Sequence, residues 1–366
     1  MSGTSLDGVD AVLVDLSKFS PQLNTTHSHP IPSHIRQKLI ELTHPDWTGS
    51  LASIGTIHQQ LGKLFADSVN ELILKSKVTP QEIIAIGSHG QTVWHQPDGS
   101  HPFSMQLGDA NLIAELTNIT TVADFRSRDI AAGGQGAPLV PAFHQSVLSH
   151  PVKNRAILNI GGIANITYLP SSNNRSNISG FDTGPGNGLV DAWINKCKQE
   201  EYDKNGAWAA SGEIKPDILD ILIADPYFKL PPPKSTGKEA FNLAWLEKVL
   251  GKKLHEYKSK DIQATLTELT AKTIADNIHN DCEELFVCGG GIHNLFLIER
   301  LKQHLPHVPI ASTEALGINP DWMEAIAFAW LAKQTIEGKA GNLPITTGAK
   351  NFRILGATYQ YTPPSF

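Results

Sequence analysis

The sequence is poor in cysteine and has no long apolar run. Its three cysteines, Cys197, Cys282 and Cys288, have neither the spacing of a zinc site nor that of a disulfide framework, which favours structural thiols in a reducing compartment. No run of about eighteen apolar residues, the length of a membrane-spanning helix, occurs. The first residues also lack the basic and then apolar stretches of a signal peptide. We therefore expect a cytoplasmic protein that neither spans a membrane nor is exported.

Positive charge is not in excess either. The chain has 30 Lys and Arg residues against 36 Asp and Glu residues, a formal net charge of -6. Non-specific nucleic-acid binding needs a basic surface that displaces counterions from phosphates, so we expect no nucleic-acid partner. A polyanionic ligand would have to be held by a local site. No set of His, Cys and Asp residues has tetrahedral zinc spacing, so we expect no tightly held structural metal.

Apolar periodicity is what the sequence does contain. At 366 residues the chain exceeds what one hydrophobic core usually supports, which predicts two domains. Apolar residues recur every three or four positions over 53–75, which predicts a helix, and a buried strand is predicted at 83–87. The same order recurs at 112–116 and 120–123, and again at 262–278 and 285–288. This alternation predicts sheets covered by helices, the α/β class.

Two Gly-containing segments open the two halves of the chain. Residues 5–16 have the pattern of a turn that leads into a strand, and residues 154–169 that of a hairpin whose turn holds two glycines. Their similarity hints at two related halves. Residues 321–334 are predicted to form a helix, and the Pro-rich stretch 230–233 is interpreted as a surface connector.

The first glycine-rich turn contains Thr4, Ser5 and Asp7 between Gly3 and Gly8. Such turns present successive N–H groups and hydroxyls as a cradle for an anion, and the Asp can hold a phosphate-bound Mg²⁺, often through water. The turn is not a Walker A sequence and lacks the Lys of that motif. Taken alone, it could equally be an ordinary hairpin turn.

A single carboxylate, Asp182, follows the apolar Phe181 and precedes a turn with Gly184 and Gly186. An Asp at the end of a strand can project into a site and act as a general base. The alternative is an Asp that only accepts hydrogen bonds from turn N–H groups, as is common in Asp-Thr-Gly sequences. An aspartic protease also uses Asp-Thr-Gly but needs two copies that share one proton. The sequence has one copy, so that interpretation is excluded.

Three glycines, Gly289, Gly290 and Gly291, follow a predicted strand and precede a predicted helix. Glycines at such a turn let a flat ring or a phosphate approach the backbone at the positive end of a helix dipole. The pattern is not G-x-G-x-x-G, and a tight strand-to-helix connection packed on the sheet is the alternative.

The region 88–136 is rich in Gly, Asp and Arg and has no long apolar pattern, which makes it a candidate binding surface. The guanidinium fork of Arg126 suits a sugar carboxylate or phosphate oxygens. A surface ion-pair cluster with the neighbouring carboxylates is the alternative. The run 87–95 combines hydrogen-bonding side chains with an aromatic ring, as a sugar site does, although His89 could be a core histidine.

Together, and in their order along the chain, these segments resemble anhydro-N-acetylmuramic acid kinases of the actin-like ATPase superfamily. The resemblance covers nearly the whole chain and rests on the segments 1–10, 87–92, 123–139, 159–165, 180–187 and 288–294. It implies an α/β fold of two actin-like, ribonuclease H-like domains, with mixed sheets flanked by helices and a cleft between the domains. The expected boundaries are 1–145 with about 335–366 for the N-terminal domain and 146–334 for the C-terminal domain.

The resemblance also implies an activity in cell-wall recycling. Such an enzyme uses ATP and Mg²⁺ to open the 1,6-anhydro ring of its sugar with water and to phosphorylate O6, which gives N-acetylmuramic acid 6-phosphate. Asp182 is implied to be the base that activates water, and Asp7 to contact the phosphate-bound metal. The implied nucleotide-binding residues are Gly3, Thr4, Ser5, Leu6, Asp7, Gly8, Val9, Asp10, Gly161, Gly162, Asn165, Gly289, Gly290 and Gly291. The implied sugar-binding residues are Ser88, His89, Gly90, Gln91, Thr92, Arg126, Gly184 and Asn187.

One departure from the family and two rival functions stay open. Family members begin with a short apolar strand ahead of Met-Ser-Gly-Thr, whereas this sequence starts at Met1. We expect either a trimmed sequence or a first sheet without an interior strand. The rivals are a kinase for an ordinary amino sugar or a carboxylate, in which Asp182 would deprotonate a hydroxyl, and a nucleotide-gated sugar sensor. A homodimer is implied by the resemblance alone.

Overall fold

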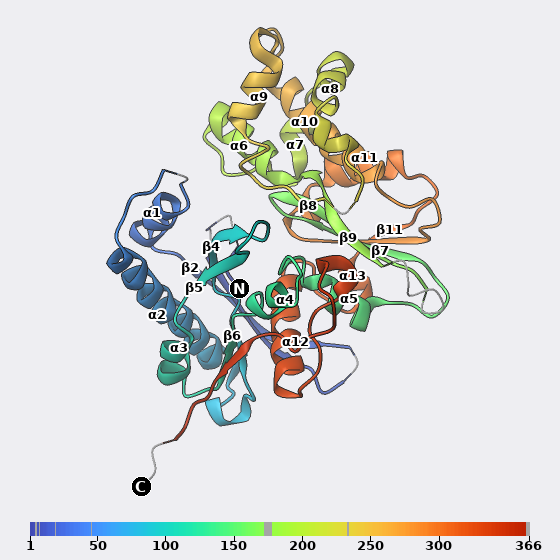
Figure 1. Ribbon diagram of the computed structural model, residues 1–366. Coiled ribbons are helices and arrows are strands. Elements are labelled where there is room, and N and C mark those ends of the chain that lie inside the picture. The colour runs from blue at the N-terminus through green and yellow to red at the C-terminus, as the bar shows by residue number, and fades with distance from the viewer. Residues whose placement is uncertain are drawn as a thin grey trace. The chain divides into compact units, whose positions relative to one another are not determined.

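The chain folds into two compact units, which Figure 1 shows in a computed structural model. The structure describes residues 1–3, 6, 8–18, 20–44, 46–171, 178–232 and 234–363. Unit 1 consists of Met1–Val147 and Trp322–Phe366, and unit 2 of Leu148–Asp321. The boundaries 1–145 with about 335–366 and 146–334 stay a prediction for independently folding domains.

In the described part of the chain, unit 1 has three small sheets. Strands β1 and β2 form an antiparallel hairpin in which Gly8 lies opposite Pro30, and β4 and β5 form a second one. A mixed sheet has the order β12-β6-β3, with β3 parallel and β12 antiparallel to β6. The strands are β1 Gly8–Asp15, β2 Gln22–Pro30, β3 Ile86–Gly87, β4 Gln91–Gln96, β5 Phe103–Leu107, β6 Thr121–Ala123 and β12 Ala357–Tyr359.

Helix α2, Leu51–Ser76, is the longest helix described in unit 1, and local sequence sets its ends. The Ser50 side chain accepts a hydrogen bond from the Ser53 N–H at the start, and Lys77 ends the helix in a left-handed conformation. Its buried face joins residues of β1 and α1 in one apolar core. The other helices of this unit are α1 Ser33–Leu42, α3 Ala110–Thr117, α4 Ser127–Ala131, α5 Val140–Leu148, α12 Met323–Ile336 and α13 Pro344–Thr347, with the 3-10 turn η1 Pro80–Glu82.

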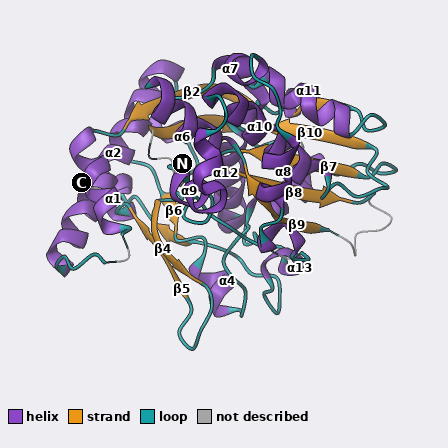
Figure 2. Ribbon diagram, turned by 90° about the horizontal axis from the view of Figure 1, so that it is seen from above, coloured by secondary structure: helices purple, strands orange, loops and turns teal. Residues whose placement is uncertain are grey.

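Unit 2 is built on one five-stranded sheet of order β11-β10-β7-β8-β9, and Figure 2 shows β10, β7, β8 and β9 side by side. Strands β11, β10 and β7 are parallel, whereas β8 is antiparallel to both β7 and β9. The sheet is therefore mixed. Its strands are β7 Arg155–Ile160, β8 Ile163–Leu169, β9 Ser179–Pro185, β10 Glu284–Cys288 and β11 Ile310–Ser312.

Helix α10, Ser259–Ala275, is the centre of unit 2. Its residues are buried on nearly every side. One apolar core lies between the sheet, α10 and α11, and a second gathers α6, α8, α9 and α10. The other helices are α6 Asn187–Lys198, α7 Ala207–Ala210, α8 Pro216–Ile223, α9 Leu243–Leu250 and α11 Leu295–His304. The 3-10 turns are η3 Lys204–Gly206, η4 Pro226–Lys229, η5 Gly251–His255, η6 Gly290–His293 and η7 Thr313–Leu316.

The α/β class is confirmed, as are the helices predicted at 53–75, 262–278 and 321–334 and the hairpin at 154–169. The buried strand predicted at 83–87 was wrong in part, because only Ile86–Gly87 is a strand and Ile84 is 81% exposed. An apolar run becomes a buried strand only where neighbours cover it, and β3 has a described partner on one edge alone. None of the described helices is long and apolar enough to cross a membrane.

Candidate active site

Asp182 lies in the edge strand β9 of unit 2, opposite Asn165 of β8. Its backbone N–H donates a hydrogen bond to the carbonyl oxygen of Lys234 at 3.0 Å. Its carboxylate oxygen Oδ2 accepts two hydrogen bonds, from the Ser235 hydroxyl at 3.0 Å and from the Thr236 N–H at 3.0 Å. A segment more than fifty residues downstream, 234–236, therefore fixes this carboxylate.

The two oxygens of the Asp182 carboxylate differ. Oδ2 has two donors, whereas no donor among the described residues reaches Oδ1. Burial raises the pKa of Asp182 above its usual value, and the hydrogen bonds from Thr236 and Ser235 partly oppose that rise. The result is an oriented carboxylate with one free oxygen and an increased affinity for a proton.

Tyr227 and Lys234 pack beside this carboxylate residue. The Tyr227 hydroxyl donates a hydrogen bond to the Asp182 carbonyl oxygen at 2.8 Å. The buried Lys234 ammonium has no hydrogen-bond partner among the described residues and lies 5.1 Å from the centre of the Tyr227 ring. Burial lowers the pKa of Lys234.

The interpretation of the Pro-rich stretch 230–233 as a mere surface connector was incomplete. Pro231 and Pro232 are indeed exposed, but residues 234–236 directly after them hold Asp182. The polar run Ser-Thr-Gly-Lys after the prolines was the available signal. It could not be assigned from sequence, because the hydrogen bonds join positions far apart in the chain.

The turn between β7 and β8 is bound to the chain that follows β9. The N–H groups of Gly186 and Gly188 donate to the Gly162 carbonyl oxygen at 3.0 and 3.1 Å, and the Asn187 N–H donates to that of Gly161 at 2.8 Å. A Cβ placed on Gly162 would lie 2.4 Å from a carbon of the Lys238 side chain, so this lysine covers the turn. The structure thus brings together three predicted site residues, Gly161, Gly162 and Asn187.

The glycines after β10 approach the same end of the sheet. Gly289 has φ +78°, and a Cβ there would lie 2.3 Å from Asn159 Oδ1 and 2.8 Å from the Ile160 carbonyl oxygen, so only glycine fits. At Gly290 the nearest atom to an added Cβ is Asn187 Nδ2 at 3.8 Å. Gly290 therefore faces open space beside Asn187.

The predicted strand-to-helix connection is confirmed, because β10 ends at Cys288 and α11 begins at Leu295. The turn η6 intervenes before α11, so the three glycines are not at the start of the α-helix. Asn294 is the N-cap of α11, and the Asn294 side chain accepts a hydrogen bond from the Leu297 N–H at 3.0 Å. Glycines disfavour α-helix, which is why the helix begins only after them.

The remaining predicted residues of unit 2 lie in the same sheet. Asn165 is half-buried opposite Asp182. Gly184 has φ +149°, and a Cβ there would lie 2.7 Å from the Phe228 ring. Gly184 is buried, so its place in the structure is explained by packing.

In unit 1 the structure joins Arg126 to the loop 88–92. Arg126 Nη2 lies 2.9 Å from His89 Nε2, and Arg126 Nη1 donates to the Gly136 carbonyl oxygen at 2.8 Å. Because Arg donates, His89 Nε2 accepts, and His89 Nδ1 then carries the proton and donates to the Gly90 carbonyl oxygen at 2.8 Å. Arg126 Nε has no partner among the described residues.

Burial governs the charges of this pair. It lowers the pKa of Arg126 to about 10, still well above neutrality. Burial, and then the positive charge of Arg126, hold the pKa of His89 well below its usual range. His89 is therefore neutral at physiological pH. Its ring also packs on Phe328, with ring centres 4.6 Å apart, so His89 is in part the core histidine that the sequence allowed.

Asp129, downstream of Arg126, has a structural task. It is fully buried, and its carboxylate accepts from the Gly136 N–H at 2.9 Å, Asn342 Nδ2 at 2.7 Å and the Thr347 hydroxyl at 2.8 Å. A surface ion-pair cluster here is thus contradicted. The carboxylate fixes the glycine-rich segment that Arg126 also binds.

The N-terminal turn is described only in part. Thr4, Ser5 and Asp7, on which the predicted phosphate and metal contacts depend, lie outside the described residues. Of its neighbours, Leu6 adopts φ 58° and its N–H donates to the Gly3 carbonyl oxygen at 3.3 Å. The described residues include no cluster of three His, Cys, Asp or Glu side chains that could hold a metal ion.

The other predicted residues of unit 1 lie near the start of the chain. Gly8, Val9 and Asp10 open β1, and the Ser2 hydroxyl donates to Gln91 Oε1 at 2.6 Å. Ser88, Gly90, Gln91 and Thr92 form or flank the start of β4. The structure thus places the first residues of the chain against the predicted sugar loop.

Comparison with known proteins gives one consistent match. The profile of the family described as "Anhydro-N-acetylmuramic acid kinase" matches residues 1–361. The chain is 53% identical to the anhydro-N-acetylmuramic acid kinase of Shewanella oneidensis, over 98% of this chain and 97% of that protein. It is 51% identical to that of Coxiella burnetii, over 98% and 96%. Among solved structures it is similar to a ROK family glucokinase from Streptomyces griseus in complex with glucose and AMPPNP, at a TM-score of 0.38 and 9% identity over 89% of this chain and 100% of that chain.

Proposed function

We propose a function from one premise, which is that the chain belongs to the anhydro-N-acetylmuramic acid kinase family. The protein is a kinase of peptidoglycan recycling that uses ATP. It hydrolyses the 1,6-anhydro bond of 1,6-anhydro-N-acetylmuramic acid and transfers the γ-phosphoryl group of ATP to O6. The products are N-acetylmuramic acid 6-phosphate and ADP.

The geometry of Asp182 carries this proposal. A general base needs a free oxygen, a fixed orientation and a pKa closer to neutrality than that of an exposed carboxylate. Oδ2 is held by Ser235 and Thr236, Oδ1 has no donor among the described residues, and burial raises the pKa. These three features fit a base that takes a proton from water or from a hydroxyl.

In the proposed step, Oδ1 of Asp182 accepts a proton from water while the water oxygen attacks the anomeric carbon. The bond between C1 and O6 breaks, and its electron pair stays on O6. An alkoxide is a poor leaving group that ordinarily needs an acid. Here the γ-phosphoryl group traps O6, and the bond between that phosphorus and its bridging oxygen breaks to release ADP. One carboxylate is therefore sufficient.

The nucleotide is proposed to bind at the glycine-rich end of the unit 2 sheet and at the N-terminal turn of unit 1. Backbone at Gly290 faces open space and permits a flat ring or a phosphate to come close. Lys238 over Gly162 is an additional cation suited to phosphate. Catalysis of phosphoryl transfer is largely positioning and charge neutralisation, so these contacts are expected to affect both ATP binding and rate.

The sugar is proposed to bind to unit 1 through the loop 88–92 and Arg126. Arg126 keeps Nε free of described partners, while its two terminal nitrogens hold His89 and the Gly136 carbonyl oxygen. Two of the five guanidinium N–H donors make these contacts, so Nε–H and one N–H on each terminal nitrogen are left for a ligand. The other role of Arg126 is to fix the loop that carries the remaining sugar contacts.

Mg²⁺ is proposed to be bound mainly by the nucleotide phosphates. Magnesium usually keeps several waters and takes one or two protein carboxylates, which fits the absence of a three-residue acidic or histidine cluster among the described residues. Asp7 is the proposed protein contact. When bound, the ion neutralises charge that develops on the phosphates.

An assay with isotopic water tests the function. Purified protein with ATP, Mg²⁺, 1,6-anhydro-N-acetylmuramic acid and ¹⁸O-water is expected to give a 6-phosphate labelled at C1. Turnover of N-acetylglucosamine or N-acetylmuramic acid without label incorporation at C1 would favour an ordinary amino-sugar kinase instead. Nucleotide binding with no product from any of these sugars would favour a sensor.

The cellular setting is also a proposal. A cytoplasmic location is proposed because the three cysteines of the sequence do not have the spacing of a disulfide framework. A homodimer is proposed from the family resemblance, and light scattering coupled to gel filtration tests it. A monomeric mass across the micromolar range would reject the dimer.

A further inference from the structure

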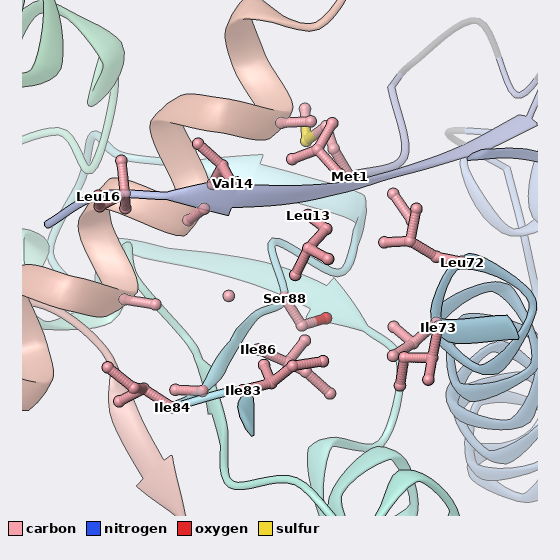
Figure 3. Close-up of a pocket in the computed structure, with 18 of the residues that line it drawn as sticks. Met1, Leu13, Val14, Leu16, Leu72, Ile73, Ile83, Ile84, Ile86 and Ser88 are labelled. Atoms are coloured by element: carbon pink, nitrogen blue, oxygen red, sulfur yellow. The ribbon is translucent and has the colours of Figure 1, made fainter. Parts of the chain in front are cut away.

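The loop 88–92 borders two surroundings that differ in chemistry. An apolar slot of about 770 Å³ lies between β1 and the segment 83–88 that includes β3. Figure 3 shows Ser88 at this slot, and the other side chains labelled there are apolar. The loop also packs on the β4–β5 hairpin, because a Cβ placed on Gly90 would lie 2.9 Å from the Cβ of Gln106. Sugar hydroxyls that leave water need hydrogen-bond partners, and the hairpin is the surrounding that offers them.

The β4–β5 hairpin has a polar face. Successive side chains of a strand point to opposite faces, and in the antiparallel register Thr92 lies opposite Gln106 and His95 opposite Ser104. These four polar side chains therefore share one face. Trp94, the neighbour of His95 in β4, lies on the opposite face. The aromatic ring of the run 87–95 is thus separate from its hydrogen-bonding side chains.

Hydrogen bonds join the polar face into one chain that ends at His95. Gln106 Nε2 donates to the Thr92 hydroxyl at 3.2 Å and to the Ser104 hydroxyl at 2.8 Å. The Ser104 oxygen also lies 3.0 Å from His95 Nδ1. Since Ser104 accepts from Gln106, its own O–H is available to donate to His95 Nδ1, and the proton of the neutral imidazole is then on Nε2. Among the described residues, none is hydrogen-bonded to this Nε2–H.

His95 lies close enough to Arg126 to be influenced by its charge. Helix α4 begins directly after Arg126 and contacts β5, and Figures 1 and 2 show α4 beside the hairpin. His95 is exposed, yet partial desolvation and then the positive charge of Arg126 lower its pKa, against the opposing effect of Asp98. At neutral pH His95 is therefore a neutral N–H donor near a permanent positive charge.

His89, the histidine predicted to bind the sugar, is engaged within the protein. Its Nε2 accepts from Arg126, and its Nδ1 donates to the Gly90 carbonyl oxygen. Neither ring nitrogen of His89 is left for a ligand. Of the two histidines near Arg126, His95 is the one with a ring N–H to offer.

We infer that His95 and Arg126 together bind the lactyl carboxylate of 1,6-anhydro-N-acetylmuramic acid, with His95 donating through Nε2–H. This inference rests on the proposed function. A carboxylate has two oxygens that accept several hydrogen bonds, and it suits one neutral donor beside one charged donor. The lactyl ether is the group that distinguishes this sugar from the corresponding N-acetylglucosamine derivative. His95 is therefore a specificity-determining residue.

Selectivity between two sugars tests the inference. The unsubstituted protein and His95→Ala are assayed with 1,6-anhydro-N-acetylmuramic acid and with 1,6-anhydro-N-acetylglucosamine, which lacks the lactyl group. A hydrogen bond to a charged group is at stake, so His95→Ala should lower kcat/KM for the lactyl sugar by about tenfold or more, mainly through KM. The loss for the analogue should be less than about twofold. An unchanged ratio, or an equal loss for both sugars, would overturn the inference.

The hairpin provides matched controls. His101 is an exposed histidine in the turn between β4 and β5, and His101→Ala should leave both sugars unaffected. Ser104→Ala removes the donor that fixes the His95 tautomer and should reduce the selectivity by about threefold, whereas Ser104→Thr keeps the hydroxyl and the selectivity. His95→Gln retains an N–H donor and should recover part of the loss. A His95→Gln variant as unselective as His95→Ala would count against a donated hydrogen bond. Because His95 is exposed, Tm should change little in its variants.

Calorimetric binding of the same sugars distinguishes this inference from the proposed function. Tighter binding of the lactyl sugar that His95→Ala removes would support the inference even if no 6-phosphate formed, and only the proposed function would then fail. Turnover with unchanged selectivity in His95→Ala would overturn the inference alone. If His95→Ala instead removed a preference over 1,6-anhydromuramic acid, which lacks the acetyl group, His95 would bind the acetamido group and the inference would be wrong.

Discussion

The hydroxyl of Ser235 donates a hydrogen bond to Oδ2 of Asp182 at 3.0 Å. These residues are 53 positions apart in the sequence. The contact places the free oxygen of the carboxylate and favours its ionised form. It therefore links a residue outside every predicted motif to the chemistry proposed for Asp182.

Replacing Ser235 is expected to move the pH profile. Ser235→Ala removes a donor to the ionised carboxylate, so the pKa of Asp182 rises further. A hydrogen bond worth about 0.5–1.5 kcal/mol corresponds to roughly 0.5–1 pH unit in the acid limb of kcat/KM. Ser235→Thr keeps the hydroxyl and is the matched control. If the acid limb reports the titration of Asp182 and does not shift in Ser235→Ala, the positioning role of Ser235 is contradicted.

Removing the charge of Asp182 is expected to abolish turnover. Asp182→Asn keeps an oxygen that accepts from Ser235 and Thr236, so folding and ATP binding should persist. Loss of a general base costs about 10²–10⁴-fold in rate. Single-turnover formation of the 6-phosphate and ATP binding by calorimetry check the two parts. Turnover within threefold of the unsubstituted protein would reject the assignment of Asp182 as base.

The same substitution is expected to alter the pH dependence of stability. Folding raises the pKa of Asp182 above 3.8, so its stabilising contribution is full below that value and is lost as pH rises through the folded-state pKa. At neutral pH the ionised carboxylate costs stability. The Tm of Asp182→Asn, relative to that of the unsubstituted protein, should therefore be higher at pH 7 than at pH 4.

Glu284 provides a control of opposite sign for that measurement. Burial alone would raise its pKa, but hydrogen bonds from Lys153 and Arg155 dominate and lower it. Its stabilising contribution is therefore present above the unfolded pKa and lost as pH falls. Glu284→Gln should lower Tm more at pH 7 than at pH 4. The same sign for both variants would contradict one of the two pKa shifts.

Substitutions at two neighbouring glycines should distinguish an effect on nucleotide binding from an effect on folding. The Cβ that Gly290→Ala adds would lie 3.8 Å from its nearest neighbouring atom. Tm should therefore change little, while KM for ATP rises about tenfold. Gly289→Ala combines φ +78° with a contact of 2.3 Å and should destabilise unit 2 by ~1–3 kcal/mol. Thermal unfolding and initial rates check both. An unchanged KM in Gly290→Ala would argue against nucleotide at this turn.

Arg126 is expected to control both His89 and the sugar. Arg126→Gln removes the positive charge that helps to depress the pKa of His89, so the imidazole pKa rises and can be followed by NMR titration. It also breaks contacts to His89 and the Gly136 carbonyl oxygen, at ~1–3 kcal/mol for a buried group left unpaired. KM for the sugar should rise while KM for ATP stays. The exposed Arg128→Gln is the control, and equal effects from both would contradict the assignment.

Periodicity and turn chemistry were sufficient for most of the fold. The helix at 53–75 and the hairpin at 154–169 follow from local patterns, because an amphipathic face and a Gly-containing turn act within a few residues. The strand at 83–87 was predicted too long for the opposite reason. Its length depends on a neighbouring strand, and no local pattern records which neighbours a segment has.

For the candidate site, the sequence indicated the positions but not their partners. Asp182 stood out because its neighbours predicted a strand end, and Gly289 because its neighbours predicted a turn. The strand end was wrong for Asp182, which lies inside β9, Ser179–Pro185. A surface ion-pair cluster was the alternative left open for the carboxylates near Arg126, whereas Asp129 is buried and accepts hydrogen bonds from Gly136, Asn342 and Thr347. Two of these donors come from residues more than two hundred positions away.

The sequence by itself determined the helices, the hairpins and the order of the glycine-rich motifs, since these depend on interactions between near neighbours. The tertiary structure alone decided that 234–236 holds the Asp182 carboxylate, that Arg126 holds His89, and that an apolar slot separates β1 from β3. The physical reason is that hydrogen bonds and cavities join segments whose separation along the chain leaves no periodic trace. Only folding brings such groups within about 3 Å of one another.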